Sequence, residues 1–106
     1  MAPRPPAWAV LVQGLAERRP VRARYHGHDR IVCPHVLGWK DDRAKVLAYQ
    51  CGGDGSGGSL PSDPRACWRS MFVDEIEDAV ITDGTWESAD NYSPRSNGID
   101  TLEMAV

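Results

Sequence analysis

The sequence has few cysteines and no long apolar run. Its three cysteines, Cys33, Cys51 and Cys67, are too few and too odd in number for a disulfide framework, which favours a reducing compartment. No segment approaches the ~20 apolar residues that a transmembrane helix needs. The apolar run at 7–12 is short and follows three prolines, unlike a signal peptide. We therefore expect a cytoplasmic protein without a membrane partner.

The sequence also lacks an excess of positive charge. It carries 12 lysines and arginines against 15 aspartates and glutamates, a net charge of -3. This balance argues against a protein whose surface is covered with positive charge for binding duplex DNA. A local basic face is still compatible with it. The 106 residues are enough for one domain with one core. Hydrophobic residues at 42% and charged residues at 25% are typical of a soluble globular protein.

Complete catalytic motifs are missing as well. The glycine-rich segment 52–59 is not followed by Gly-Lys-Ser/Thr, so it is not a phosphate-binding Walker loop. It reads as a flexible linker, or alternatively as a lid over a ligand face. No nucleophile elbow is present, and Cys33 beside His35 is too local to define a catalytic pair. We expect neither an enzyme nor a cofactor.

The pattern of apolar residues predicts one helix and several short strands. Trp8, Leu11, Val12 and Leu15 follow helical spacing, and Pro20 ends that helix. Alternation and turn residues then predict strands at 21–25, 30–37, 44–50, 68–73 and 79–81. Residues 74–75 are suited to a single helical turn. The segment 51–64 reads as a long loop.

These elements predict a mainly β fold, a small five-stranded antiparallel barrel capped by an N-terminal α-helix. We divide the chain into a flexible lead-in at 1–6, the helix plus barrel at 7–84, and a C-terminal extension at 85–106. The alternating residues 99–106 predict either an added edge strand or an adhesive tail.

The order of motifs from about Leu11 to Ile81 resembles a WYL domain, the Sm-like small β-barrel of bacterial regulators. The matching pieces follow the helix that ends in Glu17-Arg18-Arg19-Pro20-Val21. They are Arg24-Tyr25, Arg30-x-Val32-x-Pro34-x-x-Leu37, Lys45-Val46-Leu47-Ala48-Tyr49 and Arg69-x-Met71-x-Val73-Asp74-x-Ile76.

The chain departs from the family in three ways. The naming tripeptide reads Lys45-Val46-Leu47, and Phe72 and Glu75 stand where the family's last strand is usually basic. There is also no room for the usual DNA-binding helix-turn-helix. The resemblance therefore implies a divergent, stand-alone version in which part of the family's basic pocket is missing.

The resemblance implies ligand sensing in transcriptional or defence regulation, with a nucleotide or short single-stranded nucleic acid as the anionic effector. It assigns ligand contacts to Tyr25, Arg30, His35 and Arg69. Trp39, beside a glycine at a predicted strand end, is our candidate for an exposed stacking platform. A partner protein or a second copy would pass the signal on.

Three other interpretations stay open from the residues alone. The arginines could be ordinary solvated cations paired with carboxylates. Cys33 and His35, two apart on one strand, could bind zinc if Cys51 or Cys67 approached. Finally, the chain could be a protein interaction or oligomerisation module that pairs through its 99–106 tail and binds no small ligand.

Overall fold

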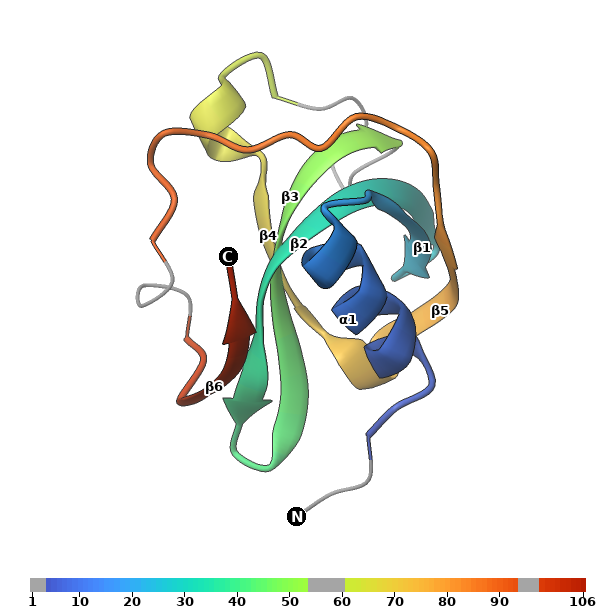
Figure 1. Ribbon diagram of the computed structural model, residues 1–106, viewed down its shortest axis with the longest axis vertical. Helices are drawn as coiled ribbons and strands as arrows, with labels where there is room; N and C mark the ends of the chain where they lie inside the picture. The colour runs from blue at the N-terminus through green and yellow to red at the C-terminus, as the bar shows by residue number, and fades with distance from the viewer. Residues whose placement is uncertain (1–3, 54–60, 94–97) are drawn as a thin grey trace.

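The computed structural model describes residues 4–53, 61–93 and 98–106. It is mainly β, with one α-helix packed on a strongly curled antiparallel sheet of six strands (Figure 1). The elements in chain order are α1 (Ala7–Glu17), β1 (Val21–Tyr25), β2 (His28–Lys40), β3 (Arg43–Gly53), η1 (Pro64–Ala66), β4 (Trp68–Phe72), η2 (Val73–Glu75), β5 (Ile76–Ile81) and β6 (Thr101–Ala105).

The sheet is built around β2. Its strand order is β4-β3-β2-β1-β5, and β6 also pairs with β2. One edge of β2 is bonded to β3 along most of its length. The other edge is shared, because β1 pairs with residues 28–32 and β6 pairs with residues 36–39. The sheet is not closed, and it has six strands rather than the five predicted for the barrel. The sixth, β6, is the added edge strand that was one of the two predictions for residues 99–106.

Most strand positions were predictable, and the errors lie at the ends. β1 matches its predicted range, and the turn predicted at 74–75 is the 3-10 helix η2. Cys51, Gly52 and Gly53, predicted as loop, extend β3, and β5 begins earlier than expected, at Ile76. The predicted loop or lid lies, from residue 54 to 60, outside the described residues. Among the described residues, no helix has the length and apolarity needed to cross a bilayer.

One extra residue in β2 changes which of its side chains face the helix. Pro34 pairs with Ala48 and Val36 pairs with Leu47, so His35 has no partner of its own and forms a β-bulge. A bulge shifts the alternation of a strand by one residue. The proline, which cannot donate a ladder hydrogen bond, lies directly before this irregularity.

The two faces of the sheet consequently carry two separate apolar clusters. On the helix side, Val32 precedes the bulge and Leu37 and Trp39 follow it, and all three pack in the main core. On the opposite side, a second cluster is covered by the segment after β5, residues 82–93, which we call the strap (orange in Figure 1). This second cluster comprises Cys33, Cys51, Tyr49, Cys67, Trp68, Trp86 and Ala89.

Helix α1 approaches the sheet closely at Gly14. A Cβ atom at this position would lie 2.7 Å from Val21 Cγ2 and 2.9 Å from the Arg19 carbonyl oxygen. The sequence suggests that Gly14 simply weakens the helix, by up to ~1 kcal/mol relative to alanine. The structure gives the residue a packing reason, since only glycine permits this distance between α1 and β1.

Gly14→Ala should therefore destabilise the protein by about 1–2 kcal/mol in spite of its higher helix propensity, because the added methyl overpacks the contact with Val21 and Arg19. Chemical denaturation would measure the change. Gln13→Ala, on the exposed side of the same helix, is the matched control and should be neutral or slightly stabilising. Equal or higher stability of Gly14→Ala would show that the helix can shift freely on the sheet.

Candidate functional site

A buried arginine lies near the start of the central strand of the sheet. Arg30, near the start of β2, is only 5% exposed and lies opposite Ala23 of β1 and Gly53 of β3. Its Nε atom is buried and has no hydrogen-bond partner. Arginine is almost never buried unless it is paired, so this side chain requires a physical explanation.

A second arginine is fixed close to it. Arg69 of β4 donates from Nε to Gln50 Oε1 at 3.1 Å and from Nη1 to the carbonyl oxygens of Ala66 and Trp68, each at 3.0 Å. Gln50 is itself 1% exposed and donates from Nε2 to the Gly52 carbonyl oxygen at 3.1 Å. The guanidinium of Arg69 is therefore held in one orientation by uncharged acceptors.

The two guanidinium groups raise each other's electrostatic energy. Burial lowers the pKa of Arg30, and the nearby positive charge of Arg69 lowers it further. Within the described part of the chain, no carboxylate forms an ion pair with either arginine. Glu75 is paired with His26 and Arg43 instead. The described residues thus supply two positive charges with no carboxylate paired to either, while the Glu75 carboxylate, shared with His26 and Arg43, lies beside the Tyr25 hydroxyl.

Tyr25 supplies the aromatic wall of this group. Its ring centroid lies 5.4 Å from Arg30 Cζ, which is within cation–π range. Its hydroxyl oxygen accepts a hydrogen bond from the Phe72 backbone N–H at 3.2 Å, and burial raises the pKa of the phenol. We call Tyr25, Arg30, Gln50 and Arg69 the Arg30 site. Three of its members are candidates from the sequence.

Gln50 is the member that the sequence analysis missed. The sequence does offer one indication of it. Gln50 is a polar residue two positions after Ala48 and four after Val46, so strand alternation places it on the same buried face as those apolar residues. Pairing with Val32 across the sheet places Gln50 on the helix-facing side, where its side chain donates to the Gly52 carbonyl oxygen and accepts from Arg69.

His35, the fourth residue that the family resemblance suggests, lies elsewhere. It is five residues from Arg30 along one strand, and an odd separation puts the two on opposite faces. Its Nδ1 lies 2.7 Å from the Cys33 carbonyl oxygen and its Nε2 lies 2.9 Å from Ser88 Oγ. The imidazole is 1% exposed. It is surrounded by the rings of Trp68, Trp86 and Tyr92.

Trp39 does not present the open stacking face that its position suggests. It is 7% exposed, stacks on Trp8 with ring centroids 5.4 Å apart, and donates from Nε1 to Glu103 Oε1 at 2.7 Å. Its edge lines a surface cavity of about 410 Å³. The other residues lining that cavity are Asp41, Asp42, Asp100 and Thr101. Three carboxylates make this a poor environment for an anion.

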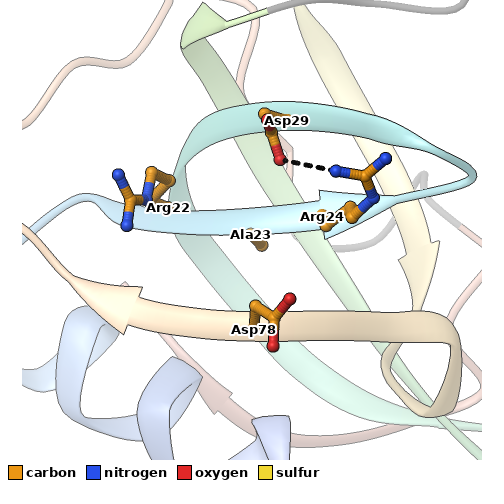
Figure 2. Close-up of a pocket in the computed structure, with 5 residues that line it drawn as sticks. All are labelled: Arg22, Ala23, Arg24, Asp29 and Asp78. Carbon is orange, nitrogen blue, oxygen red and sulfur yellow. Dashed lines mark ion pairs between the residues drawn. The ribbon is translucent and has the colours of Figure 1, made fainter.

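The outer arginines of β1 form a separate surface. Arg22 and Arg24 are exposed on the face opposite Ala23, as strand alternation predicts. They line a shallow pocket of about 280 Å³ together with Asp29 and Asp78 (Figure 2). Figure 2 shows Arg24 paired with Asp29, at 3.6 Å, while Arg22 points away from that pair. The charges of this pocket balance, unlike those of the Arg30 site.

The geometry gives the zinc hypothesis little support. The Cys33 and Cys51 sulfur atoms are 3.8 Å apart, but both ring nitrogens of His35 already have partners in Cys33 and Ser88. Cys67 turns its sulfur toward the carbonyl oxygens of Pro61 and Asp63. No group of three or more ligating side chains gathers in ranges 4–53, 61–93 and 98–106.

None of the family models, curated proteins or solved structures with which the chain was compared matches it. The case for a function therefore rests on the Arg30 site itself and on the motifs of the sequence.

The buried imidazole of His35 should make folding sensitive to acid. Burial lowers its pKa in the folded state, with the positive charge of Arg18 acting in the same direction and the Cys33 carbonyl opposing it. The unfolded chain, with a histidine pKa of about 6.5, then takes up the proton first as pH falls. Stability is complete above about pH 6.5 and declines below it, by at most about 1.4 kcal/mol per pH unit, until the folded imidazole also protonates.

Urea unfolding at several pH values between neutral and mildly acidic would measure this decline. His35→Gln, which carries no titrating proton in the range, should have a flatter profile even if it is less stable at neutral pH. An equal acid decline in the variant would assign the effect to other groups.

Proposed function

We propose that the protein is a non-enzymatic regulatory module, related to WYL domains, that binds an anionic effector at the Arg30 site. The effector is a nucleotide or a short single-stranded nucleic acid, recognised through its phosphate by Arg30 and Arg69. The single observation that carries the proposal is the buried Arg30 guanidinium, which has no carboxylate partner among the described residues and lies beside a second cation.

The energetic argument is the cost of an unpaired buried charge. Removing an ion from water costs several kcal/mol even after the protein relaxes, and attraction to a partner must offset this. Tyr25 provides only a cation–π contact, worth about 0.5–2 kcal/mol. Arg69 increases the cost because its charge has the same sign. A bound anion would remove both penalties at once.

The side chains of the site also match a phosphate ligand. Arginine offers paired N–H donors that fit phosphate oxygens, and it forms charge-assisted hydrogen bonds that are about twice as strong as neutral ones. Gln50 and two carbonyl oxygens hold the Arg69 guanidinium in place through Nε and Nη1, which reduces the ordering that binding through Nη2 requires. The Tyr25 ring is buried and stacks on His26 with centroids 4.0 Å apart, so its part in the site is to contact Arg30 rather than to stack on a base.

The topology supports the finer fold assignment that we propose, a small Sm-like barrel. β1 pairs with both β2 and β5, so the first and last strands of the meander are neighbours. β4 and β5 are the two ends of the strand order, and only the single turn η2 joins them in the sequence. Helix α1 packs over the inner face of this curled sheet (Figure 1).

The content of the site favours binding over catalysis. A nucleophile beside a general base is the minimum for covalent catalysis. The Arg30 site contains two arginines, an amide and a phenol whose pKa is raised, and none of these is a base at neutral pH. The two guanidinium groups suit recognition of an anion.

The alternative is a protein interaction or oligomerisation module. In the structure, however, β6 pairs with β2 of its own chain, and the Val106 N–H donates to the His35 carbonyl oxygen at 2.9 Å. The tail that would recruit a partner strand is therefore engaged within the chain. This favours the anion-binding hypothesis, and the molecular mass in solution with and without ligand would separate the two.

Neutralising the site should abolish anion binding. We expect saturable binding of cyclic nucleotides or of short single-stranded DNA or RNA, with affinity reduced about 10- to 100-fold in Arg30→Gln and in Arg69→Gln, because each loses a charge-assisted phosphate contact worth about 1.5–3 kcal/mol. Calorimetry or fluorescence anisotropy would measure it. Affinity should also fall as salt is raised.

Arg22→Gln is the matched control, since it removes one positive charge from the opposite face of the sheet. Its affinity should stay within a few-fold of the unaltered protein. Equal losses of affinity in all three variants would mean that binding depends on the overall charge of the protein and not on the Arg30 site. Absence of saturable binding for every probe would refute the proposal.

The site should also lower stability when it is empty. Arg30→Met retains much of the apolar stem and removes the unpaired charge, so we expect it to be more stable than the unaltered protein by about 1–2 kcal/mol. Thermal unfolding at constant ionic strength would test this. Added pyrophosphate should raise the melting temperature of the unaltered protein and not that of Arg30→Met. A destabilised Arg30→Met would mean that the charge is already compensated.

A further inference from the structure

A pair of cysteines lies on the other face of the sheet, away from the Arg30 site. The Sγ atoms of Cys33 on β2 and Cys51 on β3 are 3.8 Å apart, close to van der Waals contact. Both are free thiols in this structure. Cys33 is completely buried, whereas Cys51 at the end of β3 is partly exposed.

The backbone is shaped so that these two sulfur atoms meet. Val32 pairs with Gln50 and Ile31 pairs with Gly52, so Cys51 is the extra residue of a β-bulge. Without the bulge, Cys51 would lie diagonally from Cys33, at a separation that is long for two short side chains. Bulges redirect side chains in this way and are common beside functional groups.

The strap closes over the buried sulfur. The Glu87 backbone N–H lies 3.3 Å from Cys33 Sγ and donates to it. On either side the strap is held by Ser88 against His35 and by Trp68 Nε1, which donates to Asn91 Oδ1 at 2.9 Å. A doubly bonded ion pair between Arg65 and Asp90 anchors it further.

We propose that Cys33 and Cys51 form a reversible disulfide by exchange with a low-molecular-weight disulfide, and that this bond loosens the strap. The inference is independent of the anion-binding proposal, because it uses the opposite face of the sheet and none of the residues of the Arg30 site.

The exchange proceeds in two balanced steps. First, the accessible Cys51 sulfur attacks one sulfur of the reagent, the reagent's S–S bond breaks, and the departing half leaves as a thiol with the proton from Cys51. Second, the Cys33 sulfur attacks Cys51 Sγ, the mixed disulfide breaks, and the other half leaves with the proton from Cys33. The two cysteines lose two electrons, and the reagent gains them.

Exposure assigns these roles, because Cys51 is partly accessible and Cys33 is buried, whereas thiol acidity affects only the rate. Contact with the Cys51 sulfur lowers the pKa of Cys33, and the Glu87 N–H acts in the same direction against the opposing effect of burial. The same contact and burial raise the pKa of Cys51. Cys33 is thus the better thiolate but lies hidden, which suits a resolving cysteine that acts once Cys51 has reacted. The raised pKa of Cys51 makes its first step slow at neutral pH.

The bond would act on the strap through Cys33. In forming it, the Cys33 sulfur moves from 3.8 Å to about 2.05 Å from its partner and loses its thiol character. The hydrogen bond that the Glu87 N–H donates to this sulfur is then stretched or weakened. Trp86 of the strap packs on this cluster, so its environment reports the change.

The test is to incubate the folded protein with oxidised glutathione and to follow the intact mass. We expect the protein to lose the mass of two hydrogen atoms, with peptide mapping linking Cys33 to Cys51 and leaving Cys67 free. Tryptophan fluorescence should shift to longer wavelength on oxidation, and a thiol reductant should reverse both changes.

Three single variants assign the steps. Cys67→Ser is the matched control and should form the disulfide at the rate of the unaltered protein, because its sulfur turns toward Pro61 and Asp63. Cys33→Ser should stop at a glutathione adduct on Cys51. Cys51→Ser should react at least 10-fold more slowly, since the remaining Cys33 is buried.

The proposal is overturned if the unaltered protein accumulates a stable glutathione adduct, links Cys67 in place of either cysteine, or reacts only after unfolding. An internal disulfide that leaves the fluorescence unchanged would refute the effect on the strap. Anion binding, measured on the same oxidised sample, reports separately on the Arg30 site.

Discussion

The structure depends on one long strand and on a single extra residue within it. β2 bonds to β3 on one edge and to β1 and then β6 on the other, so every sheet contact except those of β4 and β5 passes through it. The bulge at His35 changes the alternation of this strand. Because of that change, Val32 and Leu37 both reach the helix-side core although their separation is odd.

Bulges place several of the polar and reactive groups of the molecule. His35 and Cys51 are the extra residues of two bulges between β2 and β3, and both face the strap side of the sheet. Glu103 is the extra residue between β2 and β6, and there it accepts from Trp39 and Arg4. A regular ladder would turn such side chains away or bury them without partners.

The two faces of the sheet hold two different chemistries. The end of the helix-side face carries the Arg30 site, with two cations and a buried amide, and the strap side carries thiols, an imidazole and aromatic rings. Because the sheet separates them, the anion and redox proposals can fail or succeed independently. Arg22 and Arg24 show that charge alone does not make a site, since their carboxylate neighbours balance them.

Local pattern was sufficient to predict the helix, the strand β1 and the alternation that puts Arg22 and Arg24 outside. The motifs also indicated Tyr25, Arg30 and Arg69. The same alternation, applied over five residues, would have separated His35 from Arg30. Burial of Trp39, the role of Gln50 and the meeting of Cys33 with Cys51 could not be predicted, because they depend on register, bulges and the returning strap. Periodicity along one strand determines which side a residue faces, and only the pairing between distant strands decides what it meets there.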